Sequence, residues 1–247
     1  MRSMVKRLQA QGRVRSSLAL NISLGFLAGY VDAFGYITLF GLFTAHITGN
    51  FVLMGAEMAT TGHTFPILKI LALPAFVIGV ALAKMIATQC ERREGNPLLA
   101  LYTTEMTLLL LFMLTGLATG PFDGGMSGSA IFASIAGTMA MGVHGACGRL
   151  LLPDLAPTVM MTGNVTQLVI DFIELIHGRG GKKVRNRCAK YLWPMVAFLL
   201  GALSGAFACF RFGFHALLLP VLLLLLLGYA ETRREKRAKR MAASTPQ

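Results

Sequence analysis

Two copies of one short motif carry the polar residues best suited to binding a solute in an otherwise apolar chain. They are Thr48-Gly49-Asn50 and Thr162-Gly163-Asn164. Thr and Asn side chains accept hydrogen bonds from the free N–H groups at the start of a helix, and Gly lets the backbone turn tightly. We therefore predict that each motif opens and caps a short helix. The positive end of such a helix favours an anion or a neutral polar solute over a cation.

Ionisable residues inside apolar stretches are the second set of candidates. Asp32 lies within residues 18–40, and His46 precedes the first motif. A carboxylate in lipid is costly, so Asp32 should pair with another group or line a cavity. With His46 it could form a proton relay, although a structural hydrogen bond between helices explains the same pair. Glu105 and His144, in two other apolar stretches, are secondary candidates for a solute site.

Composition places these residues in a membrane protein. The chain is 55% hydrophobic and 14% charged, with a mean hydropathy of +0.63. Soluble domains have about 45–50% apolar and about 25% charged residues. The chain therefore has too little charge to cover its apolar surface in water, and we expect lipid to cover it instead.

The basic residues are clustered. Of 23 Lys and Arg, 17 lie before residue 16, between residues 179 and 190, or after residue 232. Clusters beside apolar spans mark cytoplasmic segments, and they attract anionic lipid headgroups. The net charge of +12 therefore indicates orientation. We expect no nucleic-acid partner, because membrane-length apolar runs separate the clusters.

Eight apolar stretches follow one another along the chain. Those at residues 47–59 and 159–176 are shorter and more polar, whereas six approach the roughly 20 residues that a helix needs to cross a bilayer. The six are residues 18–40, 67–88, 98–117, 129–147, 191–210 and 214–229. The predicted domains are a basic N-terminus (1–17), a first membrane repeat (18–118), an external Gly/Pro-rich linker (119–128), a second membrane repeat (129–230) and a basic tail (231–247).

The two halves of the chain resemble each other. Residues 44–50 align with residues 158–164, and both end in Thr-Gly-Asn. Two Gly residues upstream also align, as does the pattern Ala-Phe-x-x-Gly downstream, at residues 75–79 and 197–201. Three matches in the same order indicate a duplicated membrane protein.

Charge patterning then favours one topology. The N-terminus, the turn at Arg92 and Arg93, residues 179–190 and the tail should be cytoplasmic, whereas residues 119–125 lack Lys and Arg and should be external. To place these segments on the stated sides, one of the four apolar stretches in each half must not cross the membrane. We predict an all-α integral membrane protein with about six transmembrane helices, arranged as two inverted three-helix repeats. Each repeat would include a short re-entrant Thr-Gly-Asn half-helix. Eight crossings with parallel repeats remain the alternative.

In the six-span arrangement the two half-helices would face a common site. A helix over residues 50–59 is about 15 Å long, half of a hydrocarbon core about 30 Å thick. Asn50 would then lie near the midplane, with Asn164 brought beside it by the inverted repeat. Aquaporin-like channels have a comparable architecture, which is an analogy without implied kinship.

The sequence contains few features that are typical of an enzyme. The sequence has no GxSxG, HExxH or P-loop motif, and its four Cys residues show no metal-like spacing. We expect a protein that is not an enzyme and holds no metal or cofactor.

The longest specific pattern lies between residues 29 and 50. It reads Gly29-Tyr-Val-Asp32-Ala-Phe-Gly35-Tyr-Ile, followed by Thr44-Ala-His46-Ile-Thr48-Gly49-Asn50. This pattern resembles the YoaK-like family, a set of bacterial inner-membrane proteins named as a domain of unknown function. The resemblance covers nearly the whole chain and implies about six spans in the inner membrane. It implies no substrate.

Two functions fit these observations. The first is a small-solute or anion transporter or channel, with its site at the repeat interface. The second is a non-transporting membrane module, such as a scaffold or an envelope-stress protein that binds lipid or partners through basic segments. The substrate, the coupling ion and the oligomeric state, including a homo-oligomer, stay open.

Overall fold

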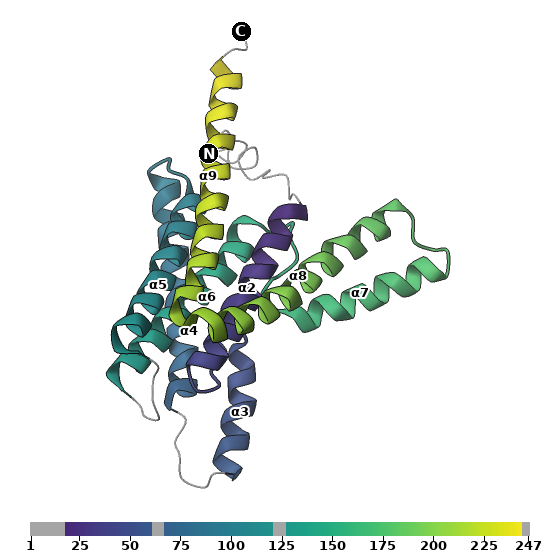
Figure 1. Ribbon diagram of the computed structural model, residues 1–247. Coiled ribbons are helices and arrows are strands. Elements are labelled where there is room, and N and C mark those ends of the chain that lie inside the picture. Colours follow the sequence, from purple (N-terminus) through teal and green to yellow (C-terminus); the bar gives the residue numbers. More distant parts are fainter. Residues whose placement is uncertain (1–17, 61–66, 121–126, 244–247) are drawn as a thin grey trace.

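The computed structural model describes residues 18–60, 67–120 and 127–243, and every regular element in these ranges is a helix (Figure 1). The elements are α2 (Leu18–Thr38), α3 (Ile47–Thr60), α4 (Ile67–Arg92), α5 (Pro97–Thr119), α6 (Gly128–Leu151), α7 (Met161–Ile176), α8 (Lys182–Phe212), the 3₁₀ helix η1 (Gly213–Leu217) and α9 (Leu218–Ala243). Five segments are long and apolar enough to cross a membrane: α2, α4, α5, α6 and Lys182–Arg237. The last takes in α8, η1 and most of α9. The all-helical membrane class is thereby confirmed.

The two basic segments at residues 179–190 and 231–247 are largely helical. α8 begins at Lys182, so most of the basic residues between 179 and 190 lie on its first turns. α9 continues through the predicted tail to Ala243. Lys, Arg and Glu are good helix formers, so charge alone does not end a helix. The predicted N-terminus lies outside the described residues, as do linker residues 121–126.

The helices of the two sequence repeats pack crosswise. α2 of the first repeat lies along α8 of the second, and α6 of the second lies along α4 of the first (Figure 1). α5 packs against α6 and α9. Each repeat therefore completes its packing with a helix from the other.

Glycines make these two crossings close. A Cβ added to Gly29 would lie 2.1 Å from the Phe198 carbonyl oxygen, and one added to Gly142 would lie 2.5 Å from the Phe76 carbonyl oxygen. Gly29 aligns with Gly142 and Phe76 aligns with Phe198 between the halves. The same aligned contact thus occurs twice. Small residues at such positions let helix backbones pack closely where lipid supplies no hydrophobic driving force.

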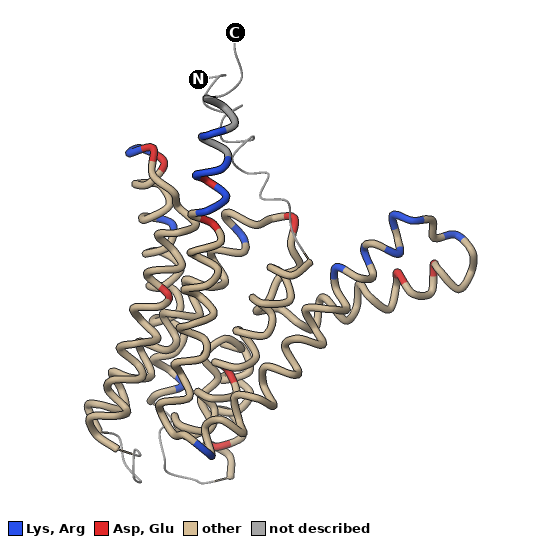
Figure 2. The backbone as a smooth tube through the Cα atoms, turned by 45° about the horizontal axis from the view of Figure 1, so that its top comes forward, with Lys and Arg blue, Asp and Glu red and all other residues tan. Residues whose placement is uncertain are grey.

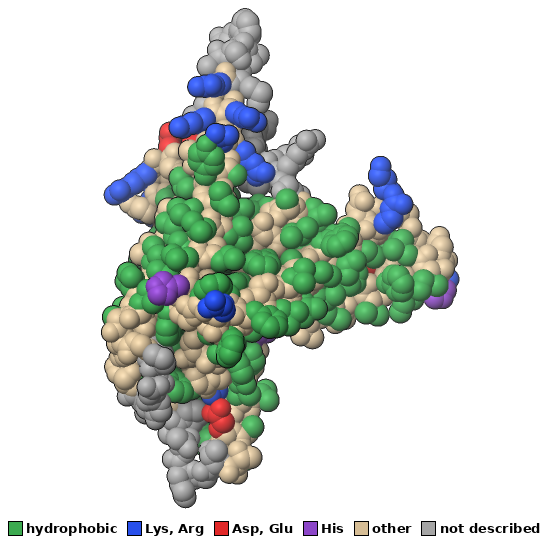
Figure 3. All heavy atoms as spheres, in the orientation of Figure 1, with side chains coloured by type: hydrophobic (Ala, Val, Ile, Leu, Met, Phe, Trp, Pro, Cys, Tyr) green, Lys and Arg blue, Asp and Glu red, His purple; other side chains and the backbone are tan. Residues whose placement is uncertain are grey.

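The outer surface of the helices is apolar, whereas the cations gather at helix ends. Phe207 and Phe210 on α8 are 73% and 93% exposed, and hydrophobic side chains are spread across the middle of the visible face (Figure 3). Lys and Arg concentrate near the α4–α5 turn, the α7–α8 turn and the end of α9 (Figure 2). This distribution suits a protein covered by lipid.

The Thr-Gly-Asn motifs lie in the first turns of the two shortest described α-helices, as predicted. α3 has 14 residues and α7 has 16. At 1.5 Å per residue they are about 21 and 24 Å long, shorter than a hydrocarbon core of about 30 Å. α3 packs mainly on α4 and α7 on α8, and the two helices point in different directions (Figure 1).

Candidate functional site

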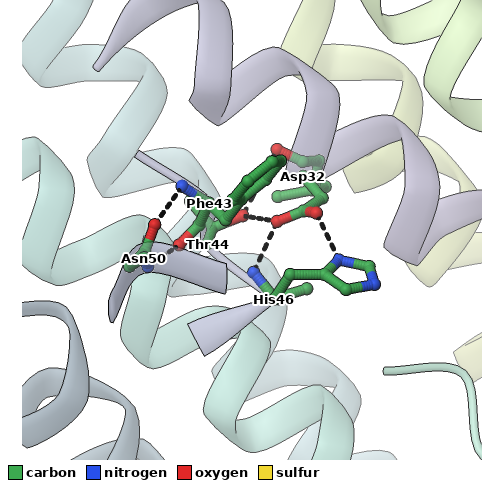
Figure 4. A network of polar contacts seen from close by, with 7 residues as sticks. Asp32, Phe43, Thr44, His46 and Asn50 are labelled. Carbon is green, nitrogen blue, oxygen red and sulfur yellow. Dashed lines mark hydrogen bonds and ion pairs between the residues drawn. The ribbon is translucent and has the colours of Figure 1, made fainter. Parts of the chain in front are cut away.

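A buried carboxylate on α2 organises the loop of residues 39–46, which joins α2 to α3 (Figure 4). Asp32 is 3% exposed. Its Oδ1 accepts a hydrogen bond from the Ala45 N–H at 2.6 Å and one from the Thr44 hydroxyl at 3.4 Å. Its Oδ2 lies 2.6 Å from Nδ1 of His46. The expectation that Asp32 pairs with another group is therefore confirmed, and His46 is one of its partners.

Asn50 holds the same loop from the other side. Its side-chain amide donates to the Phe43 carbonyl and its oxygen accepts from the Phe43 N–H, both at 2.8 Å. Asn50 is fully buried. The side chain therefore satisfies the backbone of a loop residue and does not cap α3, which differs from the predicted capping role.

Gly35 allows the loop to fold back on α2. A Cβ at this position would lie 2.6 Å from Cγ2 of Thr44. Thr44 is fully buried and has little room to move. The Gly that the sequence places three residues after Asp32 thus permits the hydrogen bonds that Asp32 makes.

His46 is the part of this network that is open to its surroundings. Its side chain is 35% exposed, and its ring lies edge-on to Phe198 of α8 at a centroid distance of 5.4 Å. Phe43 flanks it at 6.0 Å. His46 therefore lies where the loop of the first repeat meets a helix of the second repeat.

The second repeat has a related loop, residues 152–160, whose backbone accepts one hydrogen bond from the motif Asn in place of the two bonds seen in the first repeat. Asn164 donates to the Pro157 carbonyl at 2.6 Å, which matches the bond from Asn50 to Phe43. Pro157 has no N–H, so the second bond of the first repeat has no counterpart. The N-cap of α7 is Met160, which makes no side-chain capping bond. The predicted capping of α7 by the motif is therefore wrong.

Thr48 and Thr162, two motif residues that the sequence predicts in a solute site, lie at the surface. Thr48 and Thr162 are exposed, as is Gly163, while Gly49 is half-buried. Asn50 and Asn164 bond to separate loops, and neither α3 nor α7 packs along the other. The structure thus brings Asp32, His46 and Asn50 together around one loop and leaves the second motif elsewhere.

The two secondary candidates form a pair. Nδ1 of His144 lies 2.9 Å from Oε1 of Glu105, and its Nε2 lies 2.9 Å from the Thr158 hydroxyl. The sequence marks the acid and the imidazole as separate candidates and does not point directly to Thr158. The repeat alignment holds a signal for it, because Thr158 aligns with Thr44, which bonds to Asp32.

Two ion pairs hold the short helices to their neighbours. Glu57 of α3 pairs with Lys69 of α4 at 2.8 Å. Arg187 of α8 binds Asp171 of α7 through two nitrogens, at 2.7 and 2.6 Å. This guanidinium lowers the pKa of Asp171 chiefly through these hydrogen bonds, and Gln167 adds another bond. The bonds suit Asp171, whose side chain is fully buried.

Metal binding finds no support among the described residues. No group of three or more His, Cys, Asp and Glu side chains there is arranged to hold a metal ion. The four cysteines are unpaired thiols.

Apolar spans, close glycine crossings and a buried polar loop together define a multi-pass helical membrane protein. The chain belongs to the family described as "Protein of unknown function (DUF1275)", whose model matches residues 20–230. It is similar to the UPF0700 transmembrane protein YoaK of Bacillus subtilis (strain 168). The two are 26% identical over 200 residues, which cover 80% of this chain and 86% of that protein. No solved structure matches the chain. The resemblance to the YoaK-like family is thus confirmed.

Proposed function

We propose that the protein moves a small polar solute or small anion across a bacterial inner membrane, through a site beside His46. The observation that carries this proposal is the pair of Asp32 and His46. A buried carboxylate positions a partly exposed imidazole at the junction of the two repeats. Such a pair in an apolar protein is expensive and typically marks a solute or proton pathway.

The chemistry of His46 suits such a solute. Asp32 engages Nδ1, and no described residue is hydrogen-bonded to Nε2. In neutral imidazole with its proton on Nδ1, Nε2 accepts a hydrogen bond, whereas in imidazolium it donates one. The ring therefore accommodates a hydroxyl or amide in one state and an anion in the other. Phe43 and Phe198 limit the space beside it.

The proposed topology has six spans in two inverted repeats, with both termini cytoplasmic and with α3 and α7 not crossing. Three observations support it. α3 and α7 are too short for a full span. The aligned glycine contact occurs twice between the two halves, with the halves exchanging roles. Lys and Arg gather near the α4–α5 turn, the α7–α8 turn and the end of α9 (Figure 2), the places that should be cytoplasmic.

A thermal-shift screen of the purified protein tests the proposal. The panel contains inorganic anions, neutral polar solutes, amino acids and cations. A ligand that binds only the folded state stabilises it by about 2.7 kcal/mol at a hundredfold excess over Kd. We expect one class of anion or neutral solute to raise the unfolding temperature of wild type.

The matched variants are His46→Ala and His177→Ala. His177 is an exposed histidine at the end of α7, so its loss controls for the removal of an imidazole. We expect the ligand response to vanish in His46→Ala and to persist in His177→Ala. A response that persists in both variants would place the solute elsewhere. A ligand found this way is then followed by uptake into proteoliposomes, where absence of flux would contradict transport.

A second candidate function is a membrane module that binds anionic lipid without transport. The α7–α8 hairpin favours it, because α7 presents Val169, Phe172 and Ile176 outward beside the basic start of α8. Replacing Lys182, Lys183 and Arg185 by Gln should then abolish stabilisation by anionic lipid. This function predicts no stabilisation by any soluble ligand.

A further inference from the structure

The most deeply buried ionisable cluster in the described residues lies apart from the Asp32–His46 pair. It joins Glu105 of α5, His144 of α6 and Thr158 of the loop before α7. The three residues are 0%, 2% and 7% exposed. Each of the two imidazole nitrogens has a partner at 2.9 Å, Glu105 on one side and Thr158 on the other.

The cluster also contains polar atoms that lack a bond. Oε2 of Glu105 is buried and has no hydrogen-bond partner, and the Tyr102 hydroxyl, one turn earlier on α5, is in the same condition. An ionised carboxylate with one dry, unbonded oxygen is strongly disfavoured unless a charge partner compensates it. A purely structural pair would more often satisfy both oxygens.

The cluster can hold one proton in either of two arrangements, and both avoid an unpaired charge. The proton can reside on Glu105 beside a neutral His144, whose tautomer then sets whether Nε2 donates to or accepts from the Thr158 hydroxyl. It can instead reside on His144 as imidazolium, which donates from both nitrogens to Glu105 and to Thr158. Loss of this proton to bulk water leaves Glu105 ionised beside a neutral ring, which puts an unpaired charge in the core.

Few other titratable groups act on the pair. Tyr102 on α5 and Cys147 on α6 lie within electrostatic range of Glu105, and Glu231 and Arg234 of α9 act on Tyr102. Among the described residues, only Thr158 shares a hydrogen bond with the Glu105–His144 pair. Glu105 and His144 therefore form a nearly isolated acid–imidazole pair, and among the described residues Thr158 is the one further side chain hydrogen-bonded to it.

We propose that Glu105, His144 and Thr158 form an occluded site that binds one exchangeable proton and passes its state to the loop before α7. Where neutral His144 carries its proton on Nδ1, Nε2 accepts from the Thr158 hydroxyl, so protonation of Nε2 reverses the direction of that bond. Thr158 aligns with Thr44, which links Asp32 to the first loop. The inference concerns proton binding by the protein alone and does not depend on solute transport.

Nitrogen NMR of the full-length protein in lipid bilayers tests this directly. The protein is labelled with ¹⁵N-histidine and titrated from about pH 5 to 9, the range around the usual imidazole value. We expect the His144 ring signals to pass between neutral and charged forms. Glu105→Gln removes the carboxylate that pairs with the ring, so the change between the two forms should no longer occur at the wild-type pH. In Thr158→Val the Nε2 signal should shift most.

Assignment comes from the signal that His144→Gln removes. If that variant does not fold, a background with His46, His63, His177 and His215 changed to Gln keeps His144 as the single histidine. A wild-type His144 that shows no protonation change over the whole range overturns the proposal, because the pair is then a fixed structural bond. A transition that Glu105→Gln leaves in place also overturns it, because His144 then titrates without the carboxylate.

Discussion

At the scale of single residues, the polar side chains of the first repeat serve the loop backbone as much as any solute. Asp32 and Asn50 together bond to Phe43, Thr44, Ala45 and His46. Irregular backbone inside a membrane protein must be satisfied by protein or by a water-filled cavity. Asp32 and Asn50 supply these hydrogen bonds to the loop backbone and thereby fix the position of His46.

The two Asn residues should differ in their effect on stability. Asn50 satisfies two backbone groups of Phe43, whereas Asn164 satisfies one carbonyl of Pro157. A buried backbone group left without a partner costs about 1–3 kcal/mol, so we expect Asn50→Ala to lower the unfolding temperature more than Asn164→Ala. Thermal unfolding in one detergent compares them. Equal losses would mean that the second bond to Phe43 contributes nothing.

At the scale of helices, close crossings position the site. Gly29 brings α2 against the Phe198 carbonyl, and the ring of the same Phe198 lies beside His46. The distance between α2 and α8 therefore sets the environment of the imidazole. In the other crossing Gly142 brings α6 against α4, and α6 also carries His144.

A methyl group at a crossing should destabilise the protein, whereas the same change in open space should not. Gly142→Ala places Cβ 2.5 Å from the Phe76 carbonyl oxygen, and overpacking of this kind costs about 1–3 kcal/mol. A Cβ added to Gly55 of α3 would meet no neighbouring group within 4 Å, and Gly→Ala inside a helix gains about 0.5–1 kcal/mol. Thermal unfolding should thus move in opposite directions for the two variants. A loss in Gly55→Ala would reveal a contact for α3.

The α7–α8 hairpin should weaken in acid. Arg187 lowers the pKa of Asp171 in the folded protein, so the unfolded chain binds this proton more readily. The stabilisation is full above the unfolded value of about 3.9 and is lost as pH falls through the folded value. Hydrogen exchange of α7 from neutral to acidic pH measures the hairpin. Asp171→Asn should exchange faster at neutral pH and show a smaller change on acidification. An unchanged pH response would show that another group controls the hairpin.

At the scale of the whole molecule, the proposed topology rests on which ends of the helices face the cytoplasm. The turn between α4 and α5 decides between six and eight crossings. It lies inside in the six-span arrangement and outside in the eight-span arrangement, while the end of α9 is cytoplasmic in both.

Thiol labelling in intact cells separates these arrangements. In a variant whose four native cysteines are Ala, Gly95→Cys and Ser127→Cys are tested with a membrane-impermeant reagent. Both positions are exposed. We expect Ser127→Cys to react from outside and Gly95→Cys to react only after lysis, with Arg240→Cys as the cytoplasmic control. The reverse pattern at Gly95 and Ser127 would establish eight crossings.

The sequence alone determined the membrane class and the position of most helices, and it indicated an internal repeat. It could do so because hydrophobic length and residue order are local properties. The pairing of Asp32 with His46 was also accessible, since the two residues are close in the chain and both are costly in lipid. Membership of the family followed from the pattern between residues 29 and 50.

Only the tertiary structure decided which distant residues meet. Glu105 and His144 are 39 positions apart, and their contact follows from how α5 packs on α6. The bonds of Asn50 to Phe43 take the place of the expected capping role, because the buried loop brings the N–H and carbonyl of Phe43 within hydrogen-bonding distance of its side chain. The crosswise packing of α2 on α8 likewise depends on backbone approach at glycines. Such partners are set by the relative placement of whole helices, which no local pattern in the chain encodes.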